Sequence, residues 1–472
     1  MNLSAPKGGM KAAALLLASA LAVSALSCGK AAAQSALPRA VTETRWISWE
    51  AAAAVIYDEG GAFIPAKLAC MVPAVHPADG LDGVTLRAAA AARLVALADL
   101  APPFVAVKVD GLSADDPRYP LVRAEGPFYE AKRRFNGRER AFIEAEGKRL
   151  LDERGRAEPP RFYTIAAGGD AMMARGAQEL LFERGSEEVF GGTAPFLKNA
   201  DLALLNLEGV ISDRGDGAQK AYVFRFSPRL PRALREAGVD AALIANNHVM
   251  DFGEASFLDT IDHLRAAGIF PLGAGRTLAE AAGFYETNAA YTSSQMSGAI
   301  RVYGIASFPR ERSGFDGAGA AADTKRAGML FAARGGEEAL KKRLRENDEE
   351  GLDIVMFHGG VEYSDESDAA TRALYTRLVE AGADLLVGSH PHVEQGFEWV
   401  RGKPVFWSLG DYVFADMEDT PGGDKGLFVV LRYRANRLVY LDPYPLQMKG
   451  PRTVIGPREQ LERFYTLTRK LR

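Results

Sequence analysis

From residue 161 onward, short apolar runs alternate with amphipathic segments that have the period of a helix. The apolar runs predict strands at 162–167, 202–207, 241–245, 301–307, 353–357, 385–388, 405–408 and 426–432. The amphipathic segments predict helices at 229–237, 255–267, 337–346 and 369–381. An alternation of this kind predicts an α/β sandwich or a doubly wound sheet.

The stretch 34–160 has a different, Ala-rich and uneven pattern. Residues 129–156 carry many charges and little apolar periodicity, which predicts a solvated connector helix. The segment 107–111 is faintly similar to a part of periplasmic solute-binding proteins, but we favour a plain α/β accessory lobe. The residues Glu158-Pro159-Pro160 break the helix and mark a boundary, because proline disfavours helical geometry in the residue before it.

The N-terminus has the pattern of an export signal. Lys7 and Lys11 are followed by an apolar run, residues 12–27, whose sixteen residues fall short of the roughly 20 that span a bilayer. Cleavage before Cys28, in a sequence similar to a lipobox, would give a lipid-anchored protein, and cleavage after Ala33 would release a soluble one. We favour the first, and both place the protein outside the cytoplasm.

Composition narrows the class of protein. Of 472 residues, 47% are hydrophobic and 25% charged, which excludes wholesale disorder and a polytopic membrane protein. Lys and Arg total 57 against 61 for Asp and Glu, so there is no basic excess to hold nucleic acid. Both cysteines, Cys28 and Cys70, lie in the first seventy residues. The rest of the chain therefore cannot be held together by disulfides or form a cysteine-rich zinc site.

Polar residues of the types that bind metals follow five of the predicted strands. These segments are Gly168-Gly169-Asp170, Asn206-Leu207-Glu208, Asn246-Asn247-His248 with Asp251, His358-Gly359-Gly360-Val361-Glu362 and Ser389-His390-Pro391-His392. Open α/β sheets place their sites in loops at the carboxyl ends of strands. Gly-Gly-Asp and Asn-Asn alone are typical of turns, whereas the spacing of His390 and His392 favours shared ligation. Imidazole, carboxylate and amide oxygen together suit Zn, Mn or Fe. Four of the six histidines are included, and we interpret the other two, His76 and His263, as ordinary.

Several segments in the same order resemble one family. They are 169–175, 200–208, 245–253, 388–392 and 408–412. Over about 163–447 the chain is similar to the CapA family, which is associated with capsule and poly-γ-glutamate biosynthesis. The resemblance divides the chain into an export signal (1–33), an N-terminal accessory region (34–160), a CapA-like domain (161–450) and a C-terminal helix or tail (451–472).

The resemblance implies a fold, a site and a chemistry. The fold is a four-layer αββα sandwich of the calcineurin-like metallophosphatase type, with a smaller N-terminal α/β accessory lobe. The implied cofactors are two divalent ions (Mn, Zn or Fe), with Glu208 as the bridging ligand and His248 as the acid that protonates a leaving oxygen. The implied ligands are Asp170, Glu208, Asn247, His358, His390 and His392.

Two further candidates are catalytic residues. Asp251 follows His248 in the same motif. Arg175, which we expect one turn into the helix after the first motif, would bind an anionic group bidentately. A solvated helix arginine is the alternative interpretation of Arg175, and the sequence leaves both open.

The chain departs from the usual family pattern at three places. Gly359 stands where an aromatic residue is usual, Ser389-His390 where two histidines are common, and Asp411-Tyr412 where Asn-Phe is usual. The implied ligands survive these changes. Asp411, however, adds a negative charge close to a site that is expected to receive an anion.

Three hypotheses about function follow. The first is a metal-dependent phosphoesterase-like hydrolase of the cell envelope, acting on an anionic polymer, its precursor or a small phosphate ester. The second is a non-catalytic, surface-anchored assembly or export factor that binds an anionic polymer. The third, an inactive platform, is disfavoured because the ligands are retained. Expected partners are the membrane, through a lipid on Cys28, and capsule or export machinery.

Overall fold

The computed structural model describes residues 40–47, 49, 57–58, 61–62, 67–89, 93–129, 159–288, 294–310, 315–347, 350–417 and 419–471. The chain forms two compact units, Met1–Val75 with Asp82–Arg161, and His76–Leu81 with Phe162–Arg472. The predicted export signal, with Cys28 and Ala33, lies outside the described residues, as does the predicted connector helix after its first residue, Tyr129.

The first unit is a small lobe in which strands dominate the described part. Its sheet has the order β1 (Ala40–Ile47), β7 (Val122–Tyr129), β4 (Lys67–Val75) and β6 (Val105–Ala106), all antiparallel, with β5 (Leu94–Ala96) paired to β4. A hairpin of β2 (Tyr57–Asp58) and β3 (Gly61–Ala62), the helix α3 (Leu86–Ala89) and the 3-10 helix η2 (Leu97–Asp99) complete it. Tyr129 therefore ends a strand and does not begin a helix.

The second unit contains two large sheets, of which the first combines parallel and antiparallel strands. Its order is β24 (Arg437–Lys449), β23 (Lys425–Arg434), β8 (Tyr163–Met172), β9 (Leu202–Leu207), β12 (Ala241–Leu243) and β13 (Phe270–Leu272). The last four strands are parallel, and β23 and β24 are antiparallel. Strand β22 (Asp411–Phe414) pairs with the carboxyl end of β8, and β25 (Arg452–Ile455) pairs with β24.

The second sheet has a parallel centre and antiparallel edges. Its order is β15 (Tyr285–Asn288), β16 (Ala299–Ser307), β18 (Gly351–Gly359), β19 (Leu385–Ser389), β21 (Lys403–Phe406) and β20 (Phe397–Val400). The two sheets face each other: β8 contacts β19, and β12 contacts β16 and β18. Buried apolar side chains such as Ile165, Leu243 and Val355 form the core.

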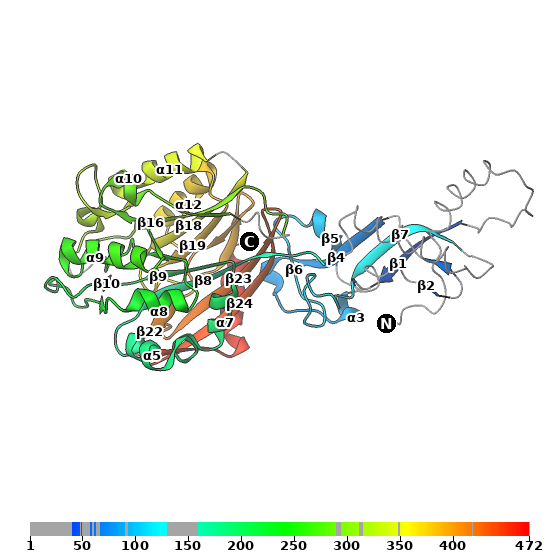
Figure 1. Ribbon diagram of the computed structural model, residues 1–472, viewed down its shortest axis with the longest axis horizontal. Helices are drawn as coiled ribbons and strands as arrows, with labels where there is room; N and C mark the ends of the chain where they lie inside the picture. Colours follow the sequence, from blue (N-terminus) through cyan, green and yellow to red (C-terminus); the bar gives the residue numbers. More distant parts are fainter. Residues whose placement is uncertain are drawn as a thin grey trace, which may run out of the picture. The chain divides into compact units, whose positions relative to one another are not determined.

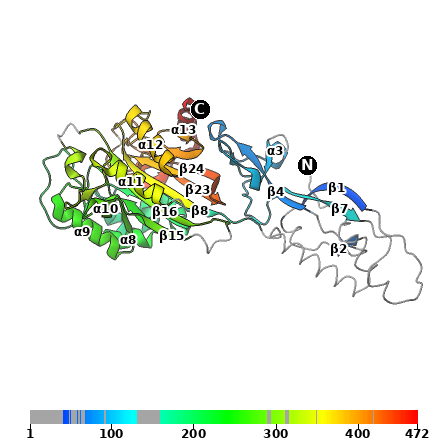
Figure 2. The same cartoon turned by 90° about the horizontal axis from the view of Figure 1, so that it is seen from above.

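Helices cover the outer face of each sheet (Figures 1 and 2). Behind the first sheet lie α5 (Ala177–Arg184), α6 (Ser186–Phe190), α7 (Ala194–Asn199), α8 (Leu230–Glu236) and α9 (Gly253–Ala266). Behind the second lie α10 (Leu278–Ala281), α11 (Gly336–Glu346) and α12 (Ala369–Ala381). Helix α7 contacts β8 and β9, α9 contacts β13, and α11 contacts β16. The predicted four-layer αββα sandwich is thus confirmed.

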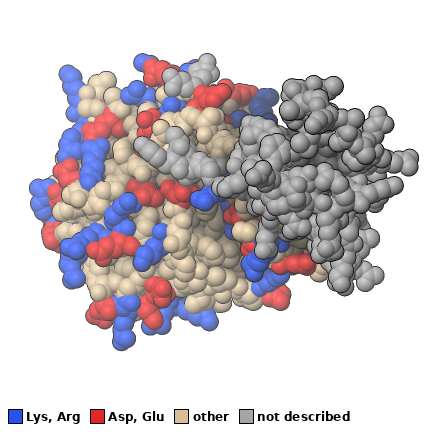
Figure 3. All heavy atoms as spheres, turned by 45° about the vertical axis from the view of Figure 1, so that its right-hand side comes forward, with Lys and Arg blue, Asp and Glu red and all other residues tan. Residues whose placement is uncertain are grey.

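The last described residues belong to the second unit. Helix α13 (Leu461–Lys470) packs on β20 and on the 3-10 helix η1 (Pro77–Asp79). Among the residues that the structure describes, no helix has the length and apolar character needed to cross a membrane. The face in Figure 3 carries acidic and basic side chains interspersed, as expected from the small net charge of -4.

All of the predicted strands and helices of the second unit are present, but the sequence misplaced several strand ends. We expected Asp170 and His358 in loops after their strands, and the structure has them inside β8 and β18. For β8 the cause is a second partner: β22 pairs with its carboxyl end and prolongs it. A Cβ at Gly169 would lie 1.9 Å from the Gly410 carbonyl oxygen, so this close approach requires glycine.

Candidate metal centre

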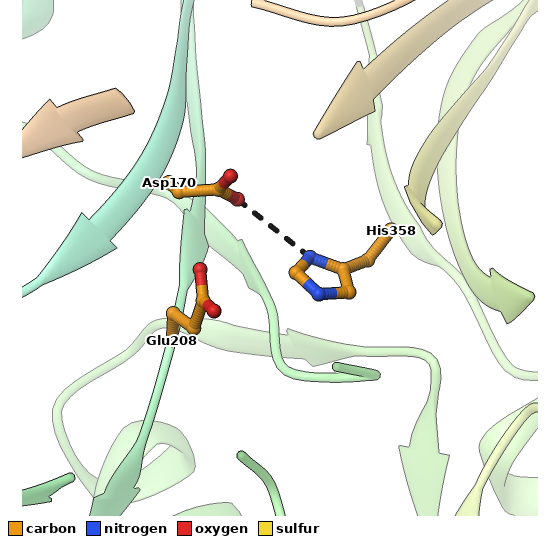
Figure 4. A group of neighbouring side chains, drawn as sticks. All are labelled: Asp170, Glu208 and His358. Carbon is orange, nitrogen blue, oxygen red and sulfur yellow. Dashed lines mark ion pairs between the residues drawn. The ribbon is translucent and has the colours of Figure 1, made fainter. Parts of the chain in front are cut away.

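Side chains from both sheets converge where the parallel strands end. One ligand atom each of Asp170, Glu208 and His358 lies within 4.8 Å of the others, and Asp170, His392 and Asp411 form a second such group. Figure 4 shows the Asp170 carboxylate and the His358 ring facing each other, with the Glu208 carboxylate directed into the same space. All five residues are buried. Residues that are far apart in the sequence therefore lie together at this point.

Asp170 lies at the centre of this cluster. Its Oδ1 is 3.6 Å from His358 Nδ1, and its Oδ2 is 3.7 Å from His392 Nδ1. Asn206 Nδ2 donates a hydrogen bond to Oδ1 (2.7 Å), and the His390 backbone N–H donates to Oδ2 (2.9 Å). The two carboxylate oxygens therefore face the two histidines separately.

Glu208 supplies the strongest indication of a cation. It is fully buried, and neither carboxylate oxygen has a hydrogen-bond partner among the described residues. Its Oε1 lies 3.7 Å from His248 Nε2 and 3.9 Å from His392 Nε2. A buried carboxylate without hydrogen bonds is costly, and a bound cation removes that cost. The residues present therefore fit a divalent metal.

The remaining expected ligands border the same space. His358 Nε2 lies 3.0 Å from Asn247 Oδ1, and the rings of His358 and His390 are 4.6 Å apart. His390 Nδ1 is buried and has no hydrogen-bond partner in the described part of the chain. The structure therefore brings together all six residues that the sequence offered as ligands.

Burial and mutual charge move the pKa values of the two carboxyl groups in opposite directions. Burial alone would raise the pKa of Asp170, but the hydrogen bond from His358 and the charges of His358 and His392 hold it well below its usual value. Burial, and then the negative charge of Asp170, raise the pKa of Glu208 well above its usual value. Carboxyl groups perturbed in this way are typical of functional sites.

The histidines and Asp411 are also perturbed. Burial, and then the neighbouring His358, lower the pKa of His390 well below its usual value. Burial opposes the charged form of His392, but Asp411 and Glu208 outweigh it and raise the pKa of His392. Burial raises the pKa of Asp411 to about 7.

His248 and Asp251 form a hydrogen-bonded pair beside the cluster. His248 Nδ1 donates to Asp251 Oδ2 at 2.6 Å, which leaves Nε2 facing Glu208. Asp251 also accepts from Lys220 Nζ (3.0 Å) and from the Phe224 backbone N–H (2.8 Å). The Phe224 ring packs 4.2 Å from the His248 ring. His248 is therefore held in one orientation from two sides.

Arg175 lies before helix α5, with a φ of 53°, and not one turn into a helix as we expected. The reason is Gly176, whose left-handed conformation delays the start of the helix. Arg175 Nη1 donates to the Ala415 carbonyl oxygen (2.7 Å), and Nε is 3.7 Å from Asp416 Oδ2. Its guanidinium lies over the ring of Phe224, the residue that packs on His248.

Sequence reasoning assigned no role in the site to three residues that contact it. Asn206 Nδ2 contacts both Asp170 Oδ1 and His358 Nδ1 (3.1 Å), so it links the two sheets. Its position in the motif before Glu208 could have indicated this role. Lys220 lies in a segment without periodicity, and no signal pointed to it. Asp411 was noticed only as a departure, and its place beside Asp170 follows from the β22–β8 pairing.

Comparison with known proteins identifies the family of this chain. Residues 164–416, more than half of the chain, match the family model described as bacterial capsule synthesis protein PGA_cap. The chain belongs to the PGA_cap family. The resemblance to CapA proteins that the sequence indicated is thereby confirmed.

Named relatives of the PGA_cap family come from several bacteria. The capsule biosynthesis protein CapA of Bacillus anthracis is 30% identical over 319 residues, which cover 65% of this chain and 73% of that protein. The PGA biosynthesis protein CapA of Bacillus subtilis (strain 168) is 26% identical over 55% of this chain and 67% of that protein.

Two solved structures match this chain with TM-scores below 0.5. The protein TT1561 of Thermus thermophilus has 15% identity and a TM-score of 0.32, covering 62% of this chain and all of that chain. The sulfate thiohydrolase SoxB of Thermus thermophilus, solved with glycerol, has 13% identity and a TM-score of 0.35. The match covers 65% of this chain and 60% of that chain.

Proposed function

We propose that this member of the PGA_cap family is a metal-dependent hydrolase of phosphate esters that acts in capsule biosynthesis. The observation that carries the proposal is Glu208, a fully buried carboxylate with no hydrogen-bond partner among the described residues, lying between His248 and His392. Divalent ions (Mn, Zn or Fe) satisfy such a group. The ligands would be Asp170, Glu208, Asn247, His358, His390 and His392.

The chain's own residues have distinct tasks in this proposal. Bound divalent ions supply Lewis-acid chemistry toward a phosphoryl group. His248 donates a proton from Nε2 to the leaving oxygen, because its Nδ1 is already engaged by Asp251. Asp251 orients the ring, and Lys220 holds Asp251 in place. Arg175 and Phe224 form a wall next to His248.

The substrate class and location complete the proposal. The relatives carry names of capsule and PGA biosynthesis, so the substrate is an anionic envelope polymer, its precursor or a small phosphate ester. The protein works outside the cytoplasm, anchored through a lipid on Cys28 or released after Ala33. It acts there together with capsule or export machinery.

Hydrolysis by metal-loaded protein tests the proposal. The protein is incubated with a panel of phosphomonoesters and phosphodiesters and with Mn²⁺, Zn²⁺ or Fe²⁺ in turn. We expect turnover of at least one class that falls to background in His248→Ala. Metal-bound protein whose turnover never exceeds that of His248→Ala would contradict the proposal.

The names of the relatives favour one second candidate, because they describe synthesis and not cleavage. In this version the chain is an assembly or export factor that binds an anionic polymer such as poly-γ-glutamate. Binding is measured directly on the polymer. If binding survives replacement of His390 and His392 and no turnover occurs, this candidate is preferred.

A further inference from the structure

Strand β22 brings one more carboxylate to the candidate metal centre. Asp411, the first residue of β22, pairs in register with Asp170, and the Asp170 N–H donates to the Gly410 carbonyl oxygen at 2.9 Å. Gly168 and Gly169 permit this approach, since a Cβ at either would meet Tyr412 or Gly410 at less than 3 Å. Asp411 is 0% exposed. The Gly-Gly-Asp motif thus fixes two carboxylates side by side.

One oxygen of Asp411 has an evident role and the other has none. Oδ1 accepts a hydrogen bond from His392 Nδ1 at 2.8 Å. Oδ2 is buried and has no hydrogen-bond partner in the part of the chain that the structure describes. If Asp411 only oriented His392, Oδ2 would remain uncompensated at a substantial cost. A cation bound at Oδ2 would remove this cost.

The cluster contains two sets of ligand atoms that share one residue. Asp170, Glu208 and His358 form one set, and each set has its ligand atoms within 4.8 Å of one another. The second set replaces Glu208 and His358 by His392 and Asp411. Asp170 serves both, because Oδ1 faces His358 and Oδ2 faces His392.

The formal charge of the carboxylates in the cluster favours two bound cations over one. Asp170, Glu208 and Asp411 supply three formal negative charges, and all are 0% exposed. One divalent ion would leave the cluster negative and repel an anionic substrate. Two divalent ions make it positive by one charge, which suits a phosphate ester.

We propose that Asp411 is a further metal ligand, which binds through Oδ2 and completes a second cation site with Asp170, while Oδ1 keeps its hydrogen bond from His392 Nδ1. This site lies beside the one formed around Glu208, and Asp170 is common to both. The inference rests on the proposed metal-dependent function. Two carboxylates make the second site rich in oxygen, and such a donor set suits Mn²⁺.

The experiment counts Mn²⁺ and reads the coupling between ions. Wild-type protein, Asp411→Ala and Asp411→Asn are saturated with Mn²⁺, analysed for bound metal and examined by electron paramagnetic resonance. Asp353→Asn, a buried carboxylate at the other end of β18, is the matched control. We expect two coupled ions in the wild type and the control, and one isolated ion in Asp411→Ala.

The asparagine variant separates a ligand from a positioning residue. Its side chain keeps the volume and the oxygen that accepts from His392, but it loses the charge. A ligand role predicts at least ~10-fold weaker binding of the second Mn²⁺ in Asp411→Asn. A role limited to orienting His392 predicts unchanged affinity, which would overturn the proposal. This variant also carries the test if Asp411→Ala does not fold.

Two outcomes distinguish this inference from the proposed function. Wild-type protein that hydrolyses phosphate esters with only one bound ion would overturn the second site and leave the proposed function standing. Two coupled ions, reduced to one in Asp411→Ala, without hydrolysis of any ester would support the second site and contradict the proposed function. Two coupled ions retained in Asp411→Ala would overturn the second site whatever the activity.

Discussion

His248 is held so that a single nitrogen is available to a substrate. Asp251 occupies Nδ1 at 2.6 Å, and Phe224 packs against the ring at 4.2 Å. Lys220, whose side chain is 6% exposed, is paired with Asp251 at 3.0 Å. Removing one member of a buried pair leaves an uncompensated charge, so these residues stabilise one another as well as the orientation of His248.

The proton-donating role of His248 predicts a dependence on the leaving group. In His248→Ala, kcat for an alkyl phosphate ester falls about 10²–10⁴-fold, because the departing alkoxide needs a proton. For a nitrophenyl ester the loss is much smaller, since nitrophenolate departs without one. The measurement is kcat for both esters with wild type and variant. Equal losses for the two esters would contradict proton donation by His248.

At the scale of elements, the close contact between β8 and β22 positions Asp170 and Asp411 together. The contact exists only because residues 168 and 169 lack side chains. The bulge in the β8–β9 register, between Ala167 and Asp170, lies at the same point. A change of one side chain here would act on the whole carboxyl end of the first sheet.

Gly169→Ala tests this contact. The added Cβ would lie 1.9 Å from the Gly410 carbonyl oxygen, so β22 must move. We expect a loss of about 1–3 kcal/mol in the free energy of unfolding, together with weaker Mn²⁺ binding. Denaturant unfolding and metal titration measure both. Gly319→Ala, whose Cβ would meet nothing within 4 Å, is the control, and equal behaviour of the two variants would refute the role of the contact.

A second prediction at this scale concerns Asp353 in β18, far from the metal centre along the strand. Burial raises the pKa of Asp353 from 3.8 to about 6, although the Tyr303 hydroxyl donates to it at 3.1 Å. The folded state therefore holds this proton more tightly than the unfolded state. Its contribution to stability is complete below pH 4 and is lost as the pH rises through 6.

Asp353→Asn removes this pH dependence. We expect the variant to gain about 1 kcal/mol relative to the wild type between pH 4 and pH 7, an amount reduced by solvent screening. Denaturant unfolding of both proteins at several pH values gives the difference. A difference that is constant with pH, or that falls, would show that the pKa of Asp353 is not raised in the folded state.

Sequence patterns predicted the elements well because apolar periodicity reports burial directly. Strand β9 begins with the apolar run Leu202–Leu205 and is buried throughout. The patterns indicated which polar residues would lie together, because such residues recur near the carboxyl ends of five predicted strands. They could not indicate Lys220 or the contacts of Asp411, which depend on segments packing together across long stretches of chain. For the same reason the extension of β8 to Asp170 and the delayed start of helix α5 were not foreseen.

At the scale of the whole molecule, the second unit includes a segment from far earlier in the chain. Residues 76–81 belong to this unit, where the Leu81 N–H donates to the Tyr465 hydroxyl at 3.3 Å. Arg469 Nη1 donates to the Ala78 carbonyl oxygen at 3.3 Å. Helix α13 therefore holds residues 76–81 against the second unit. A protein prepared for study should include both this segment and the helix.

Metal binding should stabilise this unit as a whole. A ligand that binds only the folded state at 100 times its Kd adds about 2.7 kcal/mol to the free energy of unfolding. We expect Mn²⁺ to raise the wild-type Tm, a chelator to reverse the rise, and Glu208→Gln to reduce it strongly. Scanning calorimetry measures all three. The same rise in Glu208→Gln as in the wild type would contradict metal binding at Glu208.

The most direct test of the central claim is anomalous diffraction from crystals of the protein soaked in Mn²⁺. We expect two anomalous peaks within the cluster, one contacted by Asp170, Glu208 and His358 and one by Asp170 and Asp411. Crystals with full Mn²⁺ exposure and no peak near these side chains, or with peaks only at the molecular surface, would contradict it.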